Sequence, residues 1–194
     1  MSAALQLPTP MTIEAFLAWD APPGVPWQLV DGGPVAMAPA SPIHGAIERT
    51  GSAPRQPPRC AGQPVSHRRE PRHPPGPRRG SQYAYPRPGV TCSPLVPGEP
   101  ALPNPVLLVE VLSPGNSRET WTDVWAYTTI PTVQEVLVVR SDVIGAQLLR
   151  RAPDGTWPAV PAIVDPAALE LQNIGFRIEL KALYAGTWVF EHVI

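Results

Sequence analysis

The most strongly apolar stretch of the chain covers residues 105–114, a run rich in Val and Leu that prolines bound on both sides. Four to eight apolar residues between turn signals are typical of a strand that is buried on both faces of a sheet. One acidic residue, Glu110, interrupts this run, and burying an ionised carboxylate is costly unless a partner compensates it. A metal ion is one such partner. The alternative is that Glu110 lies at the end of the strand and meets solvent or an arginine.

The part of the chain before this strand predicts a helix and a hairpin. Thr12 can cap a short helix over residues 13–19. The pair Asp31-Gly32 separates two apolar segments, which predicts a hairpin over residues 27–37. A second helix is expected to start at residues 41–47.

The part after the strand predicts a helix followed by further strands. Residues 116–119, Asn-Ser-Arg-Glu, have the spacing of a capping box, so a helix should begin there. Trp121, Val124, Trp125 and Thr128 recur at helical spacing, and we expect the two tryptophans in the core. Pro131 should end this helix. Strands are then expected over residues 133–140, over residues 146–151 and after Trp157, followed by a strand that runs into a short helix over residues 176–184.

This order of elements predicts the class of fold. A strand, a helix and a second strand in the middle of the chain, with hairpins at both ends, favour an α/β fold with a mixed sheet and helices on its faces. At 194 residues the chain is expected to form one domain, residues 1–194.

Residues 51–88 depart from the pattern of the rest of the chain. They hold 8 of the 15 Lys and Arg residues and 10 of the 29 prolines, with a single acidic residue, Glu70, and a single large aliphatic residue, Val65. Such a segment cannot bury enough apolar surface to offset the entropy lost on ordering. We therefore expect it to be disordered and to replace one helix and one core strand.

Charge and cysteine content narrow the classes of function. Outside residues 51–88 the chain has 7 basic against 15 acidic residues, which is not the balance of a nucleic-acid-binding surface. Cys60 and Cys92 have neither metal-ligand spacing nor a disulfide framework, which fits a reducing compartment. No apolar run reaches the ~20 residues of a membrane span, and the amino terminus has no signal-peptide pattern. The expectation is a cytoplasmic protein without a membrane partner.

Three motifs, in this order, resemble a bacterial family. They are Trp-Gln-Leu-Val-Asp-Gly at residues 27–32, Ala-Pro-Ala-Ser-Pro-Ile-His-Gly at 38–45 and Val-Glu-Val-Leu-Ser-Pro at 109–114. The chain resembles the putative restriction endonucleases of the PD-(D/E)xK superfamily over residues 11–48 and 89–194. This resemblance implies a restriction-endonuclease-like fold, DNA as the partner, and Mg²⁺-dependent hydrolysis of its phosphodiester bonds. It leaves the oligomeric state open, a homodimer included.

The resemblance also implies the residues of the site. Nucleases of this superfamily hold Mg²⁺ between two acidic residues on adjacent strands, and a third group, usually lysine, assists the attacking water. Glu110 matches the second acid and is the implied metal ligand. Gln28 stands where the family usually has Glu. The following helix, from which a basic group is expected, offers Glu119 and Asp123 instead. The implied catalytic residues are therefore Glu110, Asp123 and Gln28.

The first acid of the motif is missing from its expected place. In the family it follows proline, and the only matching pair here is Pro86-Arg87. A cation at a metal site repels the ion instead of binding it. Together with the lack of a helix lysine, this substitution predicts little or no cleavage by the chain as written.

A shifted reading frame across residues 51–88 would account for these departures. One codon choice for residues 81–89, read one base later, encodes His-Asn-Met-Arg-Ile-Pro-Asp-Leu and so restores the Pro-Asp pair. The same offset over residues 52–60 gives Arg-Leu-Leu-Ala-Asn-His-Leu-Ala, an amphipathic helix. The alternative is a genuine Pro/Arg-rich insert, whose arginines could bind nucleic-acid phosphates and whose prolines could form polyproline ligands.

Overall fold

The computed structural model describes residues 10–23, 27–30, 32–36, 59–60, 63–64, 66–68, 89–94 and 102–191. The chain divides into two compact units, one formed by residues 1–39 and 71–85 and the other by residues 40–70 and 86–194. The expectation of one domain over the whole chain stays a prediction. In the part of the chain that the structure describes, no helix has the length and apolar character needed to cross a membrane.

The first unit contains the predicted short helix. Helix α1, Ile13–Ala18, begins after Thr12, whose Oγ1 accepts a 3.1 Å hydrogen bond from the backbone N–H of Ala15. This bond satisfies one of the amide groups that the first helical turn leaves without a partner. Phe16 is completely buried. The prediction of a helix capped by Thr12 is confirmed.

The predicted hairpin is also present in the first unit. Strands β1, Trp27–Val30, and β2, Gly33–Ala36, pair antiparallel, with Val30 opposite Gly33. Gly32 in the connecting turn has φ +78°, and a Cβ there would lie 2.4 Å from the Cβ of Pro10. Both the left-handed conformation and this close approach require glycine. Asp31 and the helix expected at residues 41–47 lie outside the described residues.

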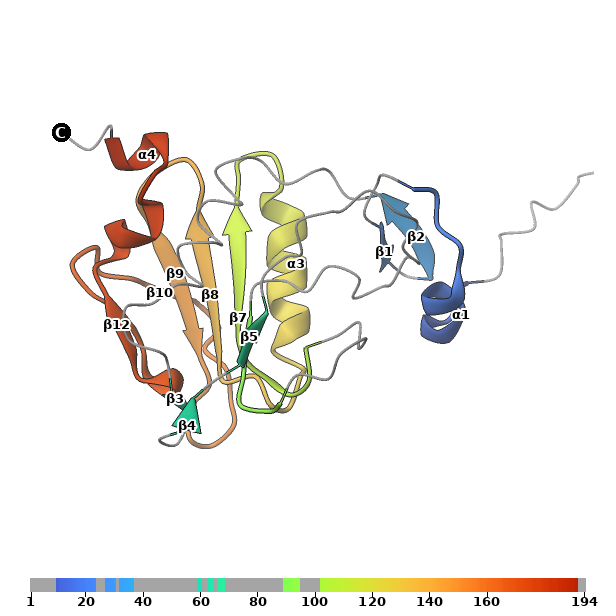
Figure 1. The fold of residues 1–194 in the computed structure, drawn as a ribbon, viewed down its shortest axis with the longest axis horizontal. Coiled ribbons are helices and arrows are strands. Elements are labelled where there is room, and N and C mark those ends of the chain that lie inside the picture. The colour runs from blue at the N-terminus through green and yellow to red at the C-terminus, as the bar shows by residue number, and fades with distance from the viewer. Residues whose placement is uncertain are drawn as a thin grey trace, which may run out of the picture. The chain divides into compact units, whose positions relative to one another are not determined.

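The second unit is built on a six-stranded mixed sheet (Figure 1). Its central strands β7 and β8 pair in parallel, joined by helix α3, Ser117–Tyr127, and the other neighbours pair antiparallel. Parallel neighbours need such a crossover connection. The predicted α/β class with a mixed sheet is confirmed. The strands, in spatial order, are β10 Ala162–Ile163, β9 Ala146–Arg150, β8 Glu135–Arg140, β7 Pro105–Leu112, β6 Gly89–Thr91 and β5 Ser66–Arg68.

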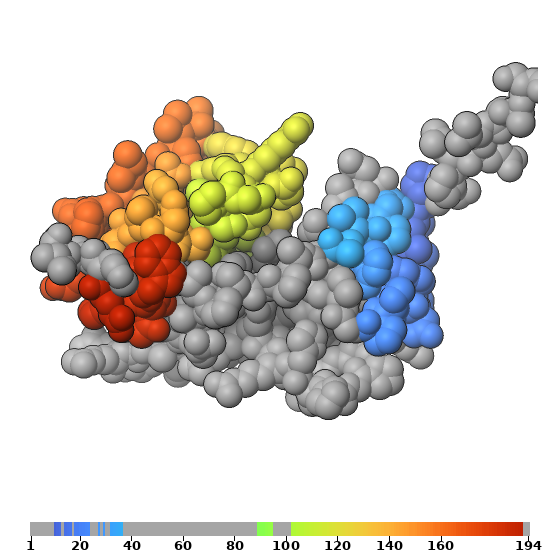
Figure 2. Space-filling view, turned by 90° about the horizontal axis from the view of Figure 1, so that it is seen from above, coloured from blue at the N-terminus to red at the C-terminus, as the bar shows by residue number. Residues whose placement is uncertain are grey.

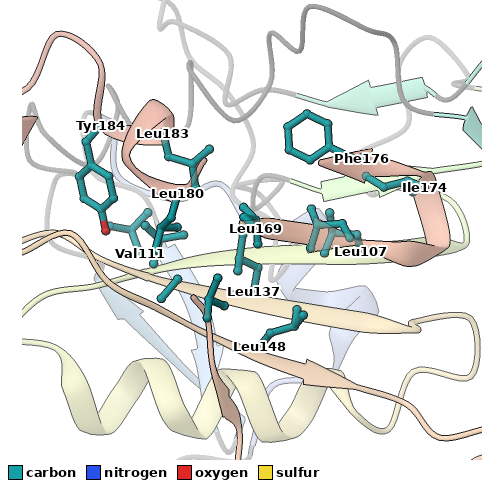
Figure 3. Close-up of a cluster of buried hydrophobic side chains, with 14 of the residues drawn as sticks. Leu107, Val111, Leu137, Leu148, Leu169, Ile174, Phe176, Leu180, Leu183 and Tyr184 are labelled. Carbon is teal, nitrogen blue, oxygen red and sulfur yellow. The ribbon is translucent and has the colours of Figure 1, made fainter. Parts of the chain in front are cut away.

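Each face of this sheet carries its own apolar cluster, because successive side chains of a strand point to opposite faces. On β7, Leu107 and Val111 belong to the cluster beneath the carboxyl-terminal elements, whereas Leu108 belongs to the cluster that contains Val124 of α3. Figure 3 shows the first cluster between the sheet and the carboxyl-terminal elements, with α3 on the opposite side. The carboxyl-terminal elements are β11 Leu169–Leu171, η1 Gln172–Ile174, β12 Phe176–Ile178, η2 Leu180–Tyr184 and α4 Trp188–Glu191.

The carboxyl-terminal elements confirm the strand and short helix predicted over residues 176–184. Strand β12 pairs antiparallel with β11, and the 3₁₀ helix η2 follows it directly. Helix α4 packs on the unit through the buried Val189, while its aromatic side chains Trp188 and Phe190 are 55% and 42% exposed. Figure 2 shows this terminal segment, coloured red, at the surface.

The expectation that residues 51–88 are disordered stays a prediction for the segment as a whole, although three short strands are described within it. Strands β3, Arg59–Cys60, and β4, Gln63–Pro64, pair antiparallel, and β5 pairs with β6 as an edge strand of the six-stranded sheet. Backbone hydrogen bonding between strands does not require the apolar side chains that this segment lacks. Cys92 is disulfide-bonded, although the spacing of the two cysteines indicated no disulfide framework.

Candidate active site

Glu110 lies in the middle of the second unit, on its longest strand. It is 1% exposed and lies next to Val138 in the parallel register of β7 and β8. Alternation along β7 places its side chain on the same face as Leu108 and Leu112, which is the face covered by α3. A carboxylate in this position has lost most of its hydration, so it needs hydrogen-bond donors from the protein or a cation.

Tyr127 of α3 supplies one such donor. Its hydroxyl donates a 2.6 Å hydrogen bond to Oε1 of Glu110. The helix directs Thr120, Val124 and Tyr127 toward the sheet, and their spacing of four and three residues keeps them on one side of α3. The carboxylate is therefore paired inside the fold, and the alternative in which Glu110 meets solvent at a strand end is wrong.

The side of α3 that faces the sheet differs from the one the sequence predicted. Trp121 packs at the edge of the α3 cluster, but Trp125 is 39% exposed, so the prediction that both tryptophans lie in the core is wrong for Trp125. Tyr127 was not among the predicted site residues. The signal that could have identified it is its position three residues after Val124, on the helix side that follows from burying Val124.

The loop between β7 and α3 fixes how the helix leaves the strand. Helix α3 begins at Ser117, as the capping-box pattern predicted, but the side chain of Asn116 makes no capping hydrogen bond. Its Oδ1 instead accepts hydrogen bonds from the backbone N–H of Ser113 at 2.7 Å and from the Ser113 hydroxyl at 2.9 Å. The predicted capping box is thus replaced by a side-chain bond that closes the loop.

The described geometry does not test whether the two remaining predicted site residues belong to the site of Glu110. Asp123 lies one helical turn before Tyr127 on α3 and is partly buried, whereas Glu119 in the first turn is exposed. Gln28 lies on β1, in the first unit, and its side chain lies outside the described residues. The assignment of Asp123 and Gln28 to the site stays a prediction.

Glu110 suits Mg²⁺ as one ligand of an open site. Mg²⁺ prefers oxygen ligands and is often held by one or two carboxylates, with water and substrate phosphates completing its shell. Among the described residues, no group of three His, Cys, Asp or Glu side chains could hold an ion. Arg87, which stands in the expected place of the first acid, precedes β6 by two residues in the sequence. Strand β6 pairs with β7, the strand that carries Glu110. The described part therefore contains the carboxylate expected for the second acid and no closed set of ligands.

Comparison with known proteins identifies one family. Residues 13–181 match the Uma2 family model, described as putative restriction endonuclease. A comparison with curated proteins gives no match.

Proposed function

Because the chain belongs to the Uma2 family of putative restriction endonucleases, we propose that its fold serves Mg²⁺-dependent hydrolysis of DNA phosphodiester bonds, with Glu110 as a metal ligand. The observation that supports this proposal is the buried carboxylate of Glu110 on the central strand β7, in the position of the second motif acid. When bound, Mg²⁺ would polarise the phosphate and lower the pKa of a bound water. The residues of the chain contribute an anionic oxygen at Glu110 and a hydroxyl donor at Tyr127 that holds it.

In the chain as written, this hydrolysis is weak or absent. In the sequence, Arg87 stands in the place of the first acid, and its positive charge would repel Mg²⁺ where the two-acid mechanism needs a second carboxylate to hold the ion. Gln28 replaces an acidic residue, and Asp123 lies in the stretch where the family has a basic group. Gln28 therefore lacks a negative charge that the two-acid mechanism uses. Arg87 and Asp123 each carry a charge of the opposite sign to the one expected at their place.

A DNA cleavage assay with Mg²⁺, and with EDTA in place of Mg²⁺, tests this proposal. We expect the chain as written to cleave supercoiled plasmid DNA no faster than its Glu110→Gln variant does. The same assay is applied to a frame-restored chain, in which the codons of residues 51–88 are read one base later. It should cut in the presence of Mg²⁺, and its own Glu110→Gln variant should not.

Two results would contradict different parts of the proposal. Rapid Mg²⁺-dependent cutting by the chain as written, lost in Glu110→Gln, would show that the first acid is dispensable. A well-folded frame-restored chain that cuts no DNA would remove the nuclease assignment. Resequencing codons 45–92 decides beforehand whether the offset frame encodes a helix and a Pro-Asp pair.

A non-catalytic role in nucleic-acid binding is the alternative, supported by the 8 arginines of residues 51–88. Arginines that contact phosphates make the logarithm of the binding constant fall linearly with the logarithm of salt concentration. Because β5 in this segment pairs with β6, substitution disturbs the sheet less than deletion. Replacing Arg55, Arg69 and Arg72 with Gln should flatten the salt dependence of binding to a DNA duplex. An unchanged slope would exclude this role.

A further inference from the structure

We propose that Asp154 and Gly155 form a site of spontaneous modification, the isomerisation of aspartate to isoaspartate, and that Thr156 restrains this reaction in the folded chain. The pair lies in the turn after β9, and all three residues are exposed, so water reaches them. Glycine has no Cβ to shield its nitrogen, and open space lies where a Cβ of Gly155 would stand. The sequence and the exposure of the turn therefore allow the reaction, which is independent of the nuclease activity proposed above.

The reaction has two steps and needs no reagent other than water. In the first, the backbone nitrogen of Gly155 attacks Cγ of Asp154. A C–N bond forms, the carboxyl C–O bond breaks, and the proton of the nitrogen leaves with the carboxyl hydroxyl as water. In the second, water opens the resulting succinimide ring. Opening at Cγ regenerates aspartate, whereas opening at the main-chain carbonyl leaves Gly155 bonded through Cγ, which is isoaspartate of unchanged mass.

The turn engages the nitrogen that would attack. The N–H of Gly155 donates a 2.8 Å hydrogen bond to the carbonyl of Ala152, and the N–H of Ala152 donates one of 2.8 Å to the carbonyl of Thr156. Gly155 closes this turn in the left-handed conformation, with φ +85°. The nitrogen can attack only after its own hydrogen bond opens, so the closed turn opposes the reaction.

Thr156 holds the group that would be attacked. Oδ1 of Asp154 accepts a 2.9 Å hydrogen bond from the backbone N–H of Thr156 and a 2.6 Å bond from its hydroxyl. Closing the succinimide ring requires the carboxylate to rotate away from these donors. The bond from the Thr156 side chain also lowers the pKa of Asp154 below its usual range. The uncharged carboxyl, which is the form that can release water, is therefore rarer than in an unrestrained aspartate.

Modification of this turn would reach Arg151. Isoaspartate carries an additional carbon in the main chain, so the two hydrogen bonds that close the turn cannot both form. Arg151 depends on the shape of this turn, since its Nε donates to the carbonyl of Gly155 at 2.9 Å and its Nη1 to that of Pro131 at 2.6 Å. Its guanidinium carbon also lies 5.9 Å from the ring centroid of Trp157. The isoaspartate form should therefore be less stable.

Peptide mapping of the full chain tests the proposal. The unaltered chain, Thr156→Val and Thr156→Ser are incubated at mildly acidic pH, with and without guanidinium chloride, and then digested with trypsin. Trypsin releases residues 152–177, in which Asp154-Gly155 is the one Asp-Gly pair, because Asp165 precedes a proline that has no N–H. Isoaspartate gives a second chromatographic peak of the same mass. Asp154→Glu should lack this peak, and circular dichroism shows whether each variant is folded.

We expect the unaltered chain to isomerise more slowly when folded than in guanidinium chloride. Thr156→Val should raise the folded-state rate by about two- to tenfold, the factor that one net hydrogen bond gives. Thr156→Ser keeps the hydroxyl and should match the unaltered chain, and all three chains should react at one rate in guanidinium chloride. The separated isoaspartate form should melt at a lower temperature.

Three results would overturn parts of the proposal. Equal folded-state rates of Thr156→Val and the unaltered chain would remove the restraint by Thr156. Equal rates of the unaltered chain with and without guanidinium chloride would remove any restraint by the turn, whether or not Thr156→Val folds. A peptide of residues 152–177 that forms no isomer even in guanidinium chloride would remove the modification site. An isoaspartate form that melts as the unaltered chain does would overturn the effect on Arg151.

Discussion

Glu135 of β8 and Arg150 of β9 face each other across the antiparallel pair and form an ion pair, with Nε of Arg150 2.7 Å from Oε1 of Glu135. The two partners differ in exposure, since the Glu135 side chain is completely buried whereas that of Arg150 is 37% exposed. The carboxylate also accepts longer hydrogen bonds from the backbone N–H groups of Gln172 and Asn173, at 3.3 and 3.4 Å. Glu135 thereby ties the sheet to the start of η1.

Because Glu135 is buried and Arg150 is partly exposed, replacing Arg150 should lower the unfolding free energy more than replacing Glu135. Arg150→Met leaves a buried carboxylate without a cation, and such a loss costs about 3–5 kcal/mol of unfolding free energy. Glu135→Gln leaves a partly exposed guanidinium that water can reach, and its amide oxygen can still accept from Gln172, so a smaller loss of about 1–2 kcal/mol is expected. Urea unfolding of the two variants measures the difference. Equal losses, or a larger loss in Glu135→Gln, would show that the buried charge is compensated by other groups.

The pair also illustrates what the sequence could predict and what it could not. The strands that carry Glu135 and Arg150 follow from apolar runs between turn signals, and both were predicted within one or two residues of their observed ends. The pairing itself depends on the register of two strands, which turn lengths and packing determine together. The sequence signal for Glu135 is the same as for Glu110, a charged residue inside an apolar strand.

The same distinction applies to the candidate site. Glu110 could be predicted because an acid in a strand buried on both faces is conspicuous in the sequence. Tyr127 was missed because the pattern of large aromatic residues suggested that Trp125 faces inward, whereas burial of Val124 turns Trp125 outward and Tyr127 toward the sheet. The rotation of a helix about its own axis is decided by tertiary packing, which outweighs the local pattern.

Tyr184 links stability to alkaline pH. Its hydroxyl is shared between the carbonyl oxygens of Arg140 and Gly145, at 2.8 and 2.9 Å, and accepts from the Gly145 N–H. Figure 3 shows its ring at the end of the cluster beneath the carboxyl-terminal elements. Burial raises the pKa of Tyr184 to about 12, above the usual value of 10.0.

Because the folded-state pKa is higher than the unfolded one, stability from Tyr184 is fully present below pH ~10 and is lost as the pH rises toward 12. The unfolding free energy should fall by up to ~1.4 kcal/mol per pH unit in this window through this one group. Tyr184→Phe is less stable at neutral pH but lacks this decline. The unfolding free energies of the unaltered chain and of Tyr184→Phe, measured in assays between pH 8 and pH 12, should therefore converge as the pH rises. Parallel curves would mean that Tyr184 does not titrate differently on unfolding.

Arg140 and Asp142 form a bidentate pair at the surface of the β8–β9 loop, with bonds of 3.0 and 2.8 Å. The hydrogen bond from Arg140 lowers the pKa of Asp142 below 3.8, so its contribution is present above that pH and is lost as the pH falls through the lowered value. Both side chains are substantially exposed, at 48% and 33%, so Asp142→Asn should cost less than about 1 kcal/mol at neutral pH.

High salt should reduce the effect of Asp142→Asn further, because screening weakens exposed ion pairs. The matched control is Glu179→Gln, which breaks the single-bond pair with Lys181, where both side chains are about 60% exposed. We expect no measurable effect of that change. Thermal unfolding at low and high salt compares the two variants, and a loss in Asp142→Asn that is independent of salt would contradict the surface assignment.

The Asn116–Ser113 contact determines how α3 leaves β7, and thus where Tyr127 meets Glu110. Asn116→Ala removes both hydrogen bonds to Ser113 and should cost about 1–2 kcal/mol. Asn116→Asp keeps an acceptor in place and adds a negative charge at the amino end of the helix, where the helix dipole favours it, so it should retain full stability. Ser113→Ala removes one of the two bonds and should lie between these variants. Chemical denaturation gives the order, and an unaltered stability of Asn116→Ala would show that water replaces Ser113 without loss.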